Sequence, residues 1–549
     1  MKKHLCLVIL LILGVSLSAS AQWSTDTQEN TLISDFEGEK AVTHIAQTED
    51  GKYFISWYGG ADNYNMNLAL LDSTGYSLWD EPLVVSDHPQ NTWVADYSLA
   101  VDNDGNAVIS FADIRNGNPD LVIYKVDQNG EHLFGDDGVM VTETDSEEFF
   151  PTICVTESNE TVVTWQHSDE SGSVGLALQR IDTNGALLWE EPVILIDEEF
   201  DYNTPVPIAT TEDEVIVLYF YQSGPFFSPD RELYAQRFDV NGVEVWENPT
   251  VLCGVTGIPG FAFPQAKSDG NGGLITSWQD DRDNNQLGNV AVQHLLEDGS
   301  LQFPENGIEL VEAGSMGHFS PSTAGIDEAG SIVVYWRTTN SSQGMSGLKS
   351  QKIAADGTRV WSDQGVELLE LGSHVQLVNG AALHADSSWV SYSINPDGNQ
   401  AINEVYLFGL DGDGEIILDQ APVATAATSK GDVVMSGIYN GQLVNAWVND
   451  ADPSEVRAQA IEVLDTDVSV EDFLEIADKT VVKQLGDRVE VEPEVASLEI
   501  YSISGRLLSK TDCLGKKEVL LPSDLPNSIF ILLARDRSGR PLQSFQLTW

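Results

Sequence analysis

The chain has 549 residues, 42% of them hydrophobic, with 46 glycines and a formal net charge of −59 at pH 7. It is too long for one ordinary hydrophobic core, so we expect a large repeat fold or several domains. A surface this acidic repels nucleic acid and anionic membranes, which excludes both as partners, and it favours cations and neutral or basic partners. Solubility in an extracellular or salty setting is the simplest explanation of the charge.

Residues 1–21 have the pattern of a secretory signal. Lys2 and Lys3 precede an apolar run from Leu5 to Leu17, and small residues at 18–21 offer a cleavage site before Gln22. The run is too short for a membrane span and no second run follows, so we expect an exported chain without a membrane anchor. The three remaining cysteines are odd in number and widely spaced, which predicts neither a disulfide framework nor a zinc site.

A β-type apolar segment that ends in an aromatic residue recurs eight times, at separations of 54 to 58 residues. A second marker, a turn in which glycine is followed four residues later by a large apolar residue, keeps the same period from Gly75 and Trp79 to Gly414 and Leu418. Two markers with one period indicate a repeat architecture. The closing aromatics are Trp57, Phe111, Trp165, Phe220, Trp278, Trp336, Tyr392 and Trp447.

Each repeat contains four short β-type runs; in the second they are 98–101, 107–111, 121–126 and 138–142. Asn-Gly and Asp-Gly turns between runs supply the positive φ of tight hairpins. Four antiparallel strands per repeat, arranged in a ring, predict an all-β fold with an eight-bladed β-propeller over residues 22–466; seven blades is the alternative. The eighth repeat lacks its last strand, and we expect the N-terminal strand 31–35 to complete that blade.

After residue 466 the period is lost and the charge is more balanced. We expect a linker over 467–488 and a small antiparallel β-sandwich over 489–549, since several β-type runs there are separated by turn residues.

The succession LEIYSISGRLL, followed by VLLPSDLPNSIFILLARDRSGRPLQSFQL, resembles the C-terminal sorting domain of the Bacteroidetes type IX secretion system. This resemblance implies outer-membrane export, with the type IX secretion machinery as a partner, and a secreted or surface-attached product. The propeller repeats also resemble uncharacterised repeats of exported Bacteroidetes proteins, which carry a Trp-x-Asp-x-Arg step. Asp113 with Arg115 and Asp280 with Arg282 keep that step here.

The loops between second and third strands are the longer and more varied ones, and loops on one propeller face usually carry function. Aromatic faces beside carboxylates and amides suit neutral sugars or extended peptides. The periodic aromatics are expected to fill space between blades instead. The Asp-Arg pairs could contact a ligand or join blades. The candidate ligand-binding residues are Tyr58, Tyr64, Asp113, Arg115, Tyr221, Phe226, Phe227, Asp280 and Arg282.

No cofactor is indicated. Asp102–Gly105 and Asp411–Gly414 place hard oxygen donors on tight turns, so calcium is an alternative, but turn chemistry alone explains these residues. No His-Glu-x-x-His, Gly-x-Ser-x-Gly or Walker motif occurs, so no catalytic residue is assigned.

We therefore expect a monomeric secreted or cell-surface propeller that acts as a binding or adhesion module for a glycan or a protein. The alternative is a secreted hydrolase, glycosidase-like or sialidase-like, with its site on the loop face of the propeller.

Overall fold

The computed structural model forms two compact units, Met1–Ile461 and Glu462–Trp549. The predicted signal 1–21 and the candidate residues Phe226 and Phe227 lie outside the described residues. The described residues are 23–60, 64–90, 96–169, 171–197, 199–224, 229–255, 257–260, 262–263, 265–285, 287–312, 314–463, 482–485, 488–491, 495–502, 507–513, 516–520, 529–535 and 541–548.

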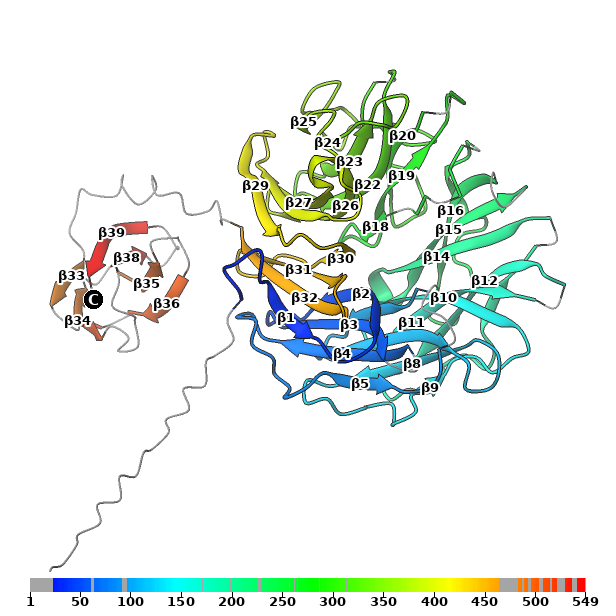
Figure 1. Ribbon diagram of the computed structural model, residues 1–549, viewed down its shortest axis with the longest axis horizontal. Coiled ribbons are helices and arrows are strands. Elements are labelled where there is room, and N and C mark those ends of the chain that lie inside the picture. Colours follow the sequence, from blue (N-terminus) through cyan, green and yellow to red (C-terminus); the bar gives the residue numbers. More distant parts are fainter. Residues whose placement is uncertain are drawn as a thin grey trace, which may run out of the picture. The chain divides into compact units, whose positions relative to one another are not determined.

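The first unit consists of eight four-stranded antiparallel sheets arranged around a common axis (Figure 1). Helical structure in its described part is limited to two short 3-10 turns, η1 (Thr211–Asp213) and η2 (Pro396–Gly398). The prediction of an all-β, eight-bladed propeller is confirmed, and the seven-bladed alternative is wrong.

Each blade follows chain order from its first to its fourth strand. Blade 1 consists of β2 (Glu39–Gln47), β3 (Tyr53–Gly60), β4 (Asn65–Leu71) and β5 (Leu83–Ser86), and blade 2 of β6 (Ser98–Val101), β7 (Ala107–Asp113), β8 (Asp120–Val126) and β9 (Val139–Met140). Blade 3 consists of β10 (Glu147–Val155), β11 (Thr161–Ser168), β12 (Val174–Ile181) and β13 (Val193–Leu195), and blade 4 of β14 (Asp201–Ala209), β15 (Val215–Ser223), β16 (Asp230–Phe238) and β17 (Thr250–Cys253).

Blades 5 to 8 repeat the pattern, except that the last strand of blade 8 comes from the start of the chain. Blade 5 consists of β18 (Gln265–Ser268), β19 (Leu274–Asp280), β20 (Asn289–Leu295) and β21 (Ile308–Glu309), and blade 6 of β22 (Gly317–Ile326), β23 (Ile332–Thr339), β24 (Ser346–Ile353) and β25 (Val366–Leu369). Blade 7 consists of β26 (Val375–His384), β27 (Ser387–Ile394), β28 (Glu404–Leu410) and β29 (Ile416–Ala424), and blade 8 of β30 (Lys430–Met435), β31 (Gln442–Asn449), β32 (Glu455–Glu462) and β1 (Thr31–Ser34).

The first strands form a closed circle. Each contacts the first strand of the next blade, from β2 through β6, β10, β14, β18, β22 and β26 to β30, and β30 contacts β2. In blade 8, β1 pairs antiparallel with β32, with Thr31 opposite Ala458 and Leu32 opposite Arg457. In Figure 1 the blue β1 lies beside the orange β32, so the two ends of the propeller chain share one sheet.

The glycine turns between third and fourth strands join neighbouring blades. The indole of Trp79 in blade 1 lies against Gly130 of blade 2, and its Nε1 donates a 2.9 Å hydrogen bond to the Gln128 carbonyl. The same contact recurs from Trp189 to blade 4 and from Trp361 to blade 7. The second sequence marker therefore describes an inter-blade contact.

Trp23 makes this contact between blades 8 and 1, although it lies outside the repeats. Its Nε1 donates to the Ser73 carbonyl at 2.9 Å, and a Cβ added to Gly75 (φ +84°) would lie 2.6 Å from the indole. Only glycine therefore fits at this position of the turn. The N-terminal segment thus supplies both the missing strand and the missing aromatic of the eighth repeat.

The eight periodic aromatics lie on the second strands and are 0–1% exposed. They fill space between sheets, as periodic aromatics usually do. Trp336 also hydrogen-bonds His318 on β22: its Nε1 donates to Nδ1 at 2.9 Å. Burial, together with the charge of Lys349, lowers the pKa of His318 from 6.5 to about 4.

This histidine makes stability depend on pH. Because its folded pKa lies below the unfolded value, the contribution of neutral His318 is complete above pH 6.5 and is lost as pH falls towards 4. Between pH 7 and pH 4.5 we expect protonation of this histidine to lower the free energy of unfolding by about 2–3 kcal/mol. Urea denaturation at pH 7 and pH 4.5 measures it, and His318→Gln, which keeps an acceptor for Trp336, should show a smaller fall. An equal fall in both proteins would contradict this assignment.

The second unit contains two sheets in its described part, a three-stranded β33-β34-β37 and a four-stranded β36-β35-β38-β39. Strand β33 begins before residue 489, inside the segment expected to be a linker. Side chains of both sheets, including Val489, Leu498 and Leu532, share one buried cluster. The strands are β33 (Val482–Leu485), β34 (Arg488–Val491), β35 (Ser497–Ser502), β36 (Leu507–Asp512), β37 (Glu518–Leu520), β38 (Ile529–Arg535) and β39 (Pro541–Thr548).

Candidate functional site

Strand register identifies the face of the propeller that carries its variable loops. In blade 1 the start of β2 pairs with the end of β3, Glu39 opposite Gly60, and Gly59 pairs with Asn65 at the start of β4. The loop between second and third strands therefore lies at the same end of the blade as the incoming inter-blade connection. We call this end of all blades the loop face.

Tyr58 and Tyr64, both near the β3–β4 loop, have different surroundings. Tyr58 is 2% exposed, its ring centroid lies 4.8 Å from that of Tyr97 in blade 2, and burial raises its pKa well above 10. Tyr64 is half-buried, with its hydroxyl 3.4 Å from Glu39 Oε2. Tyr58 is thus a core residue, whereas Tyr64 still meets solvent.

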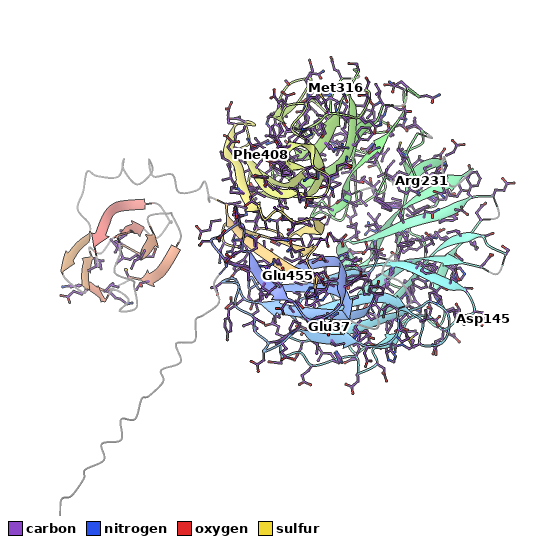
Figure 2. The ribbon with its side chains drawn as sticks, in the orientation of Figure 1. Glu37, Asp145, Arg231, Met316, Phe408 and Glu455 are labelled. Carbon is purple, nitrogen blue, oxygen red and sulfur yellow. The ribbon has the colours of Figure 1, made fainter. Side chains whose placement is uncertain are left out.

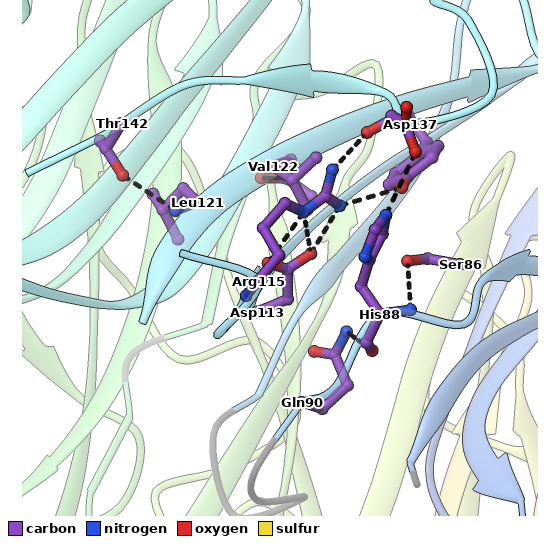
Figure 3. A network of polar contacts seen from close by, with 11 residues as sticks. Ser86, His88, Gln90, Asp113, Arg115, Leu121, Val122, Asp137 and Thr142 are labelled. Carbon is purple, nitrogen blue, oxygen red and sulfur yellow. Dashed lines mark hydrogen bonds and ion pairs between the residues drawn. The ribbon is translucent and has the colours of Figure 1, made fainter. Parts of the chain in front are cut away.

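Asp113, the last residue of β7, and Arg115 in the following loop form an ion pair in blade 2 (Figure 3). The fully buried carboxylate accepts hydrogen bonds from Arg115 Nε at 2.8 Å and Nη2 at 2.6 Å, and from its backbone N–H at 3.1 Å. Nη1 donates to the Asp137 carbonyl at 2.8 Å, and Asp137 Oδ1 lies 3.2 Å from His88 Nε2. Arg115 therefore connects the β7–β8 loop to the β8–β9 connection of the same blade.

Asp280 and Arg282 repeat this geometry in blade 5. Nη2 lies 2.6 Å from Asp280 Oδ2, the Arg282 N–H donates to Oδ1 at 3.1 Å, and Nη2 also donates to the Asn306 carbonyl at 3.0 Å. Asp280 additionally accepts from Trp278 Nε1 at 2.9 Å. Both Asp-Arg pairs are made within a blade, so neither joins two blades to each other.

Tyr221 belongs to an aromatic group on blade 4 that the sequence did not bring together. Its ring stacks on Phe200 at 4.4 Å and 15°, and lies 5.3 Å from the rings of both Tyr202 and Tyr234. All four rings are half-buried, so part of each meets solvent. We call Phe200, Tyr202, Tyr221 and Tyr234 the blade 4 aromatic cluster. The neighbouring Arg231, labelled in Figure 2, is buried and lies over the ring of Phe220 at 4.6 Å.

Carboxylates surround this cluster. The Tyr234 hydroxyl donates to Glu232 Oε2 at 2.7 Å. Burial raises the pKa of Tyr221, and the negative charges of Asp197 and Glu199 raise it further. The phenols are therefore neutral hydrogen-bond donors at physiological pH, beside carboxylate acceptors. Such a surface offers ring faces for the C–H side of a sugar and oxygens for its hydroxyls.

A second feature of the loop face is a polar pocket of about 300 Å³ at blade 2. Asp120, at the start of β8, is 1% exposed, and its Oδ1 accepts from the Thr144 N–H at 3.1 Å. Burial raises the pKa of Asp120, and the charge of Glu148 adds to this effect. A carboxyl with a raised pKa can hold a proton for transfer. The other lining residues are Asn116, Asn118, Glu143, Thr144 and Asp145, the last of which is labelled in Figure 2.

Among the described residues, no group of three or more His, Cys, Asp or Glu side chains is arranged to hold a metal ion. Asp102 and Asp411 instead accept backbone N–H groups of their own turns, from Asn106 at 2.8 Å and Glu415 at 2.9 Å. In the same part of the chain there is no helix long and apolar enough to cross a membrane.

No protein-family model and no curated protein sequence matches the chain. Among solved structures it is similar to the polysaccharide lyase Uly1, with 11% identity over 77% of this chain and 90% of that chain and a TM-score of 0.43. It is also similar to the BP39L lectin from Burkholderia pseudomallei (11% identity, 70% and 99% covered, TM-score 0.44) and to the Dos1 propeller (12%, 77% and 93%, 0.42). At these identities and TM-scores the likenesses carry nothing about function.

Proposed function

We propose that the protein is a secreted or cell-surface binding module whose blade 4 aromatic cluster binds a neutral glycan. The observation that carries the proposal is the close packing of Phe200, Tyr202 and Tyr234 around Tyr221, beside carboxylate acceptors. Neutral sugars suit this surface because they need stacking and hydrogen bonds without charge, and the acidic propeller repels anionic ligands in general.

The export route is part of this proposal. The N-terminal pattern of residues 1–21 supports passage across the inner membrane, and the resemblance of residues 489–549 to type IX sorting domains supports passage across the outer one. A binding module delivered in this way meets glycans outside the cell.

Binding is tested with a glycan array, followed by calorimetry with the best neutral oligosaccharide. We expect Tyr221→Ala to weaken the affinity by about fivefold or more, because an aromatic contact contributes about 1 kcal/mol beyond its buried area. Tyr76→Ala removes an exposed tyrosine (47% exposed) from a turn on the opposite face and should leave the affinity unchanged. Equal affinity in wild type, Tyr221→Ala and Tyr202→Ala would remove the cluster as the site.

A secreted hydrolase is the second candidate, and Asp120 is the observation that favours it. Its buried carboxyl lines a polar pocket and has a raised pKa, as a proton donor to a glycosidic oxygen requires. Incubating array-positive oligosaccharides with the protein and measuring new reducing ends separates the candidates. Turnover that Asp120→Asn abolishes would favour the hydrolase, whereas retention without turnover favours the binding module.

A further inference from the structure

A groove of about 480 Å³ lies between blades 5 and 6, away from the blade 4 aromatic cluster. Its side chains come from the β19–β20 loop and strand β21 of blade 5 and from the β24–β25 turn of blade 6. Polar and charged groups predominate, with one large apolar side chain. The lining side chains are Arg282, Ile308, Glu309, Thr358, Arg359 and Asp363.

Two arginines meet in this groove although 77 positions separate them in the sequence. Only eight arginines occur between residues 22 and 466. Arg359 Nε donates to the Glu309 carbonyl at 2.9 Å, and its Nη2 donates to the Val311 carbonyl at 3.3 Å. Arg282 is held by Asp280 through Nε and Nη2. Two positioned guanidinium groups thus line one hollow of a strongly acidic protein.

Both guanidinium groups retain donors. Within the described part of the chain, the structure gives no hydrogen-bond partner to Nη1 of Arg282 or of Arg359. Glu309 lies near both arginines: burial raises its pKa, and the two positive charges oppose that rise. The four charged lining side chains are two arginines and two carboxylates, and the buried Asp280 carboxylate behind Arg282 adds one further negative charge.

We propose that this groove binds the carboxylate-bearing ring of an acidic saccharide. Planar guanidinium groups pair with carboxylates through directed, charge-assisted hydrogen bonds. The oxygens of Glu309, Asp363 and Thr358 are placed to accept sugar hydroxyls. The site differs from the neutral-glycan surface in its blades and in its ligand, and it does not depend on that proposal.

Blades 2 and 3 provide a natural comparison. Arg115 holds Asp113 as Arg282 holds Asp280, with Nη2–Oδ2 distances of 2.6 Å in both pairs. In the turn between the third and fourth strands of blade 3, Leu187 forms an isolated antiparallel β-bridge with Ile181, and Arg359 forms the same kind of bridge with Ile353 in blade 6. Leu187 is therefore the structural counterpart of Arg359. The equivalent position between blades 2 and 3 therefore lacks the second arginine.

The test is calorimetry of the full chain with trigalacturonate in low salt, compared with a neutral trisaccharide of the same linkage. We expect trigalacturonate to bind and Arg359→Gln to weaken it tenfold or more, because a charge-assisted hydrogen bond is lost. Arg359 contacts backbone carbonyls, so its replacement leaves no carboxylate unpaired. Arg359→Lys keeps the charge without the planar fork and should give an intermediate affinity.

Two control variants test whether the effect is specific to this groove. Arg115→Gln breaks the matched ion pair in blade 2 and should leave trigalacturonate binding unchanged. Tyr221→Ala should also leave it unchanged, which separates a failure here from a failure of the neutral-glycan site. The proposal is overturned if trigalacturonate does not bind at millimolar concentration, if Arg359→Gln binds it equally well, or if a Glu-rich peptide binds more tightly through Arg359.

Discussion

A chain that starts at Phe36 will lose the closure of its propeller between blades 8 and 1. The missing segment contains β1 and Asn30, whose buried amide donates to the Val423 carbonyl at 2.8 Å and to Gln459 Oε1 at 3.0 Å. It also contains Trp23, which is 9% exposed. Losing a buried Trp costs about 3 kcal/mol and each unpaired buried group about 1–3 kcal/mol, so we expect a loss of 5 kcal/mol or more.

Thermal unfolding and size-exclusion chromatography measure this effect. The truncated chain should unfold at a markedly lower temperature and associate, because β32 becomes an unpaired edge strand. Trp23→Ala in the full chain is the milder variant, and Trp79→Ala removes the same type of contact inside the ring. Of the two, only Trp23→Ala should make the N-terminal segment sensitive to proteases. A truncated chain with unchanged stability would show that the ring closes without its N-terminal strand.

The period of the sequence was sufficient to predict the blades, because each repeat carries its own strands and turn. Trp23 was missed for a physical reason. It lies eight residues before β1 and follows no glycine turn, so its role depends on where closure of the ring places it beside Gly75. A local pattern contains no information about that contact.

Candidate ligand residues were harder to predict, because exposure on the loop face depends on the neighbouring blade. Tyr58 and Tyr221 both come near the end of a second strand, but Tyr97 of the next blade covers Tyr58. Tyr221 stays half-buried among Phe200 and two tyrosines from separate strands. The density of aromatic residues between 200 and 234 was the available signal.

The groove between blades 5 and 6 shows the same limit. Arg282 was selected because it belongs to a recognisable Asp-x-Arg step, but that step fixes a loop and says nothing about a second arginine. Arg359 occupies an ordinary turn position in its own repeat. Its meeting with Arg282 follows from the packing of blades, so only the three-dimensional structure shows it.

The buried carboxylate of Asp280 gives the second large effect that we expect. Asp280→Ala leaves the Arg282 guanidinium without its carboxylate partner and the Trp278 N–H without its acceptor. Removing one partner of a buried ion pair costs about 3–5 kcal/mol, and the 16% exposure of the Arg282 side chain places the expectation near 3 kcal/mol. Urea denaturation measures this cost, and a loss below about 1 kcal/mol would contradict it.

Asp113→Ala is the matched comparison. Asp113 accepts hydrogen bonds from Nε, Nη2 and the backbone N–H of Arg115, as Asp280 does from Arg282, but among the described residues Asp113 accepts none from a tryptophan N–H. Its cost should be smaller than that of Asp280→Ala by about 1 kcal/mol, the contribution of one hydrogen bond. The two pairs lie in blades 2 and 5 and share no partner, so the double variant should lose the sum of both costs. A cost for Asp113→Ala equal to or larger than that for Asp280→Ala would show that the indole of Trp278 adds nothing to the pair. Additive losses would establish that each Asp-Arg pair stabilises its own blade independently of the other pair.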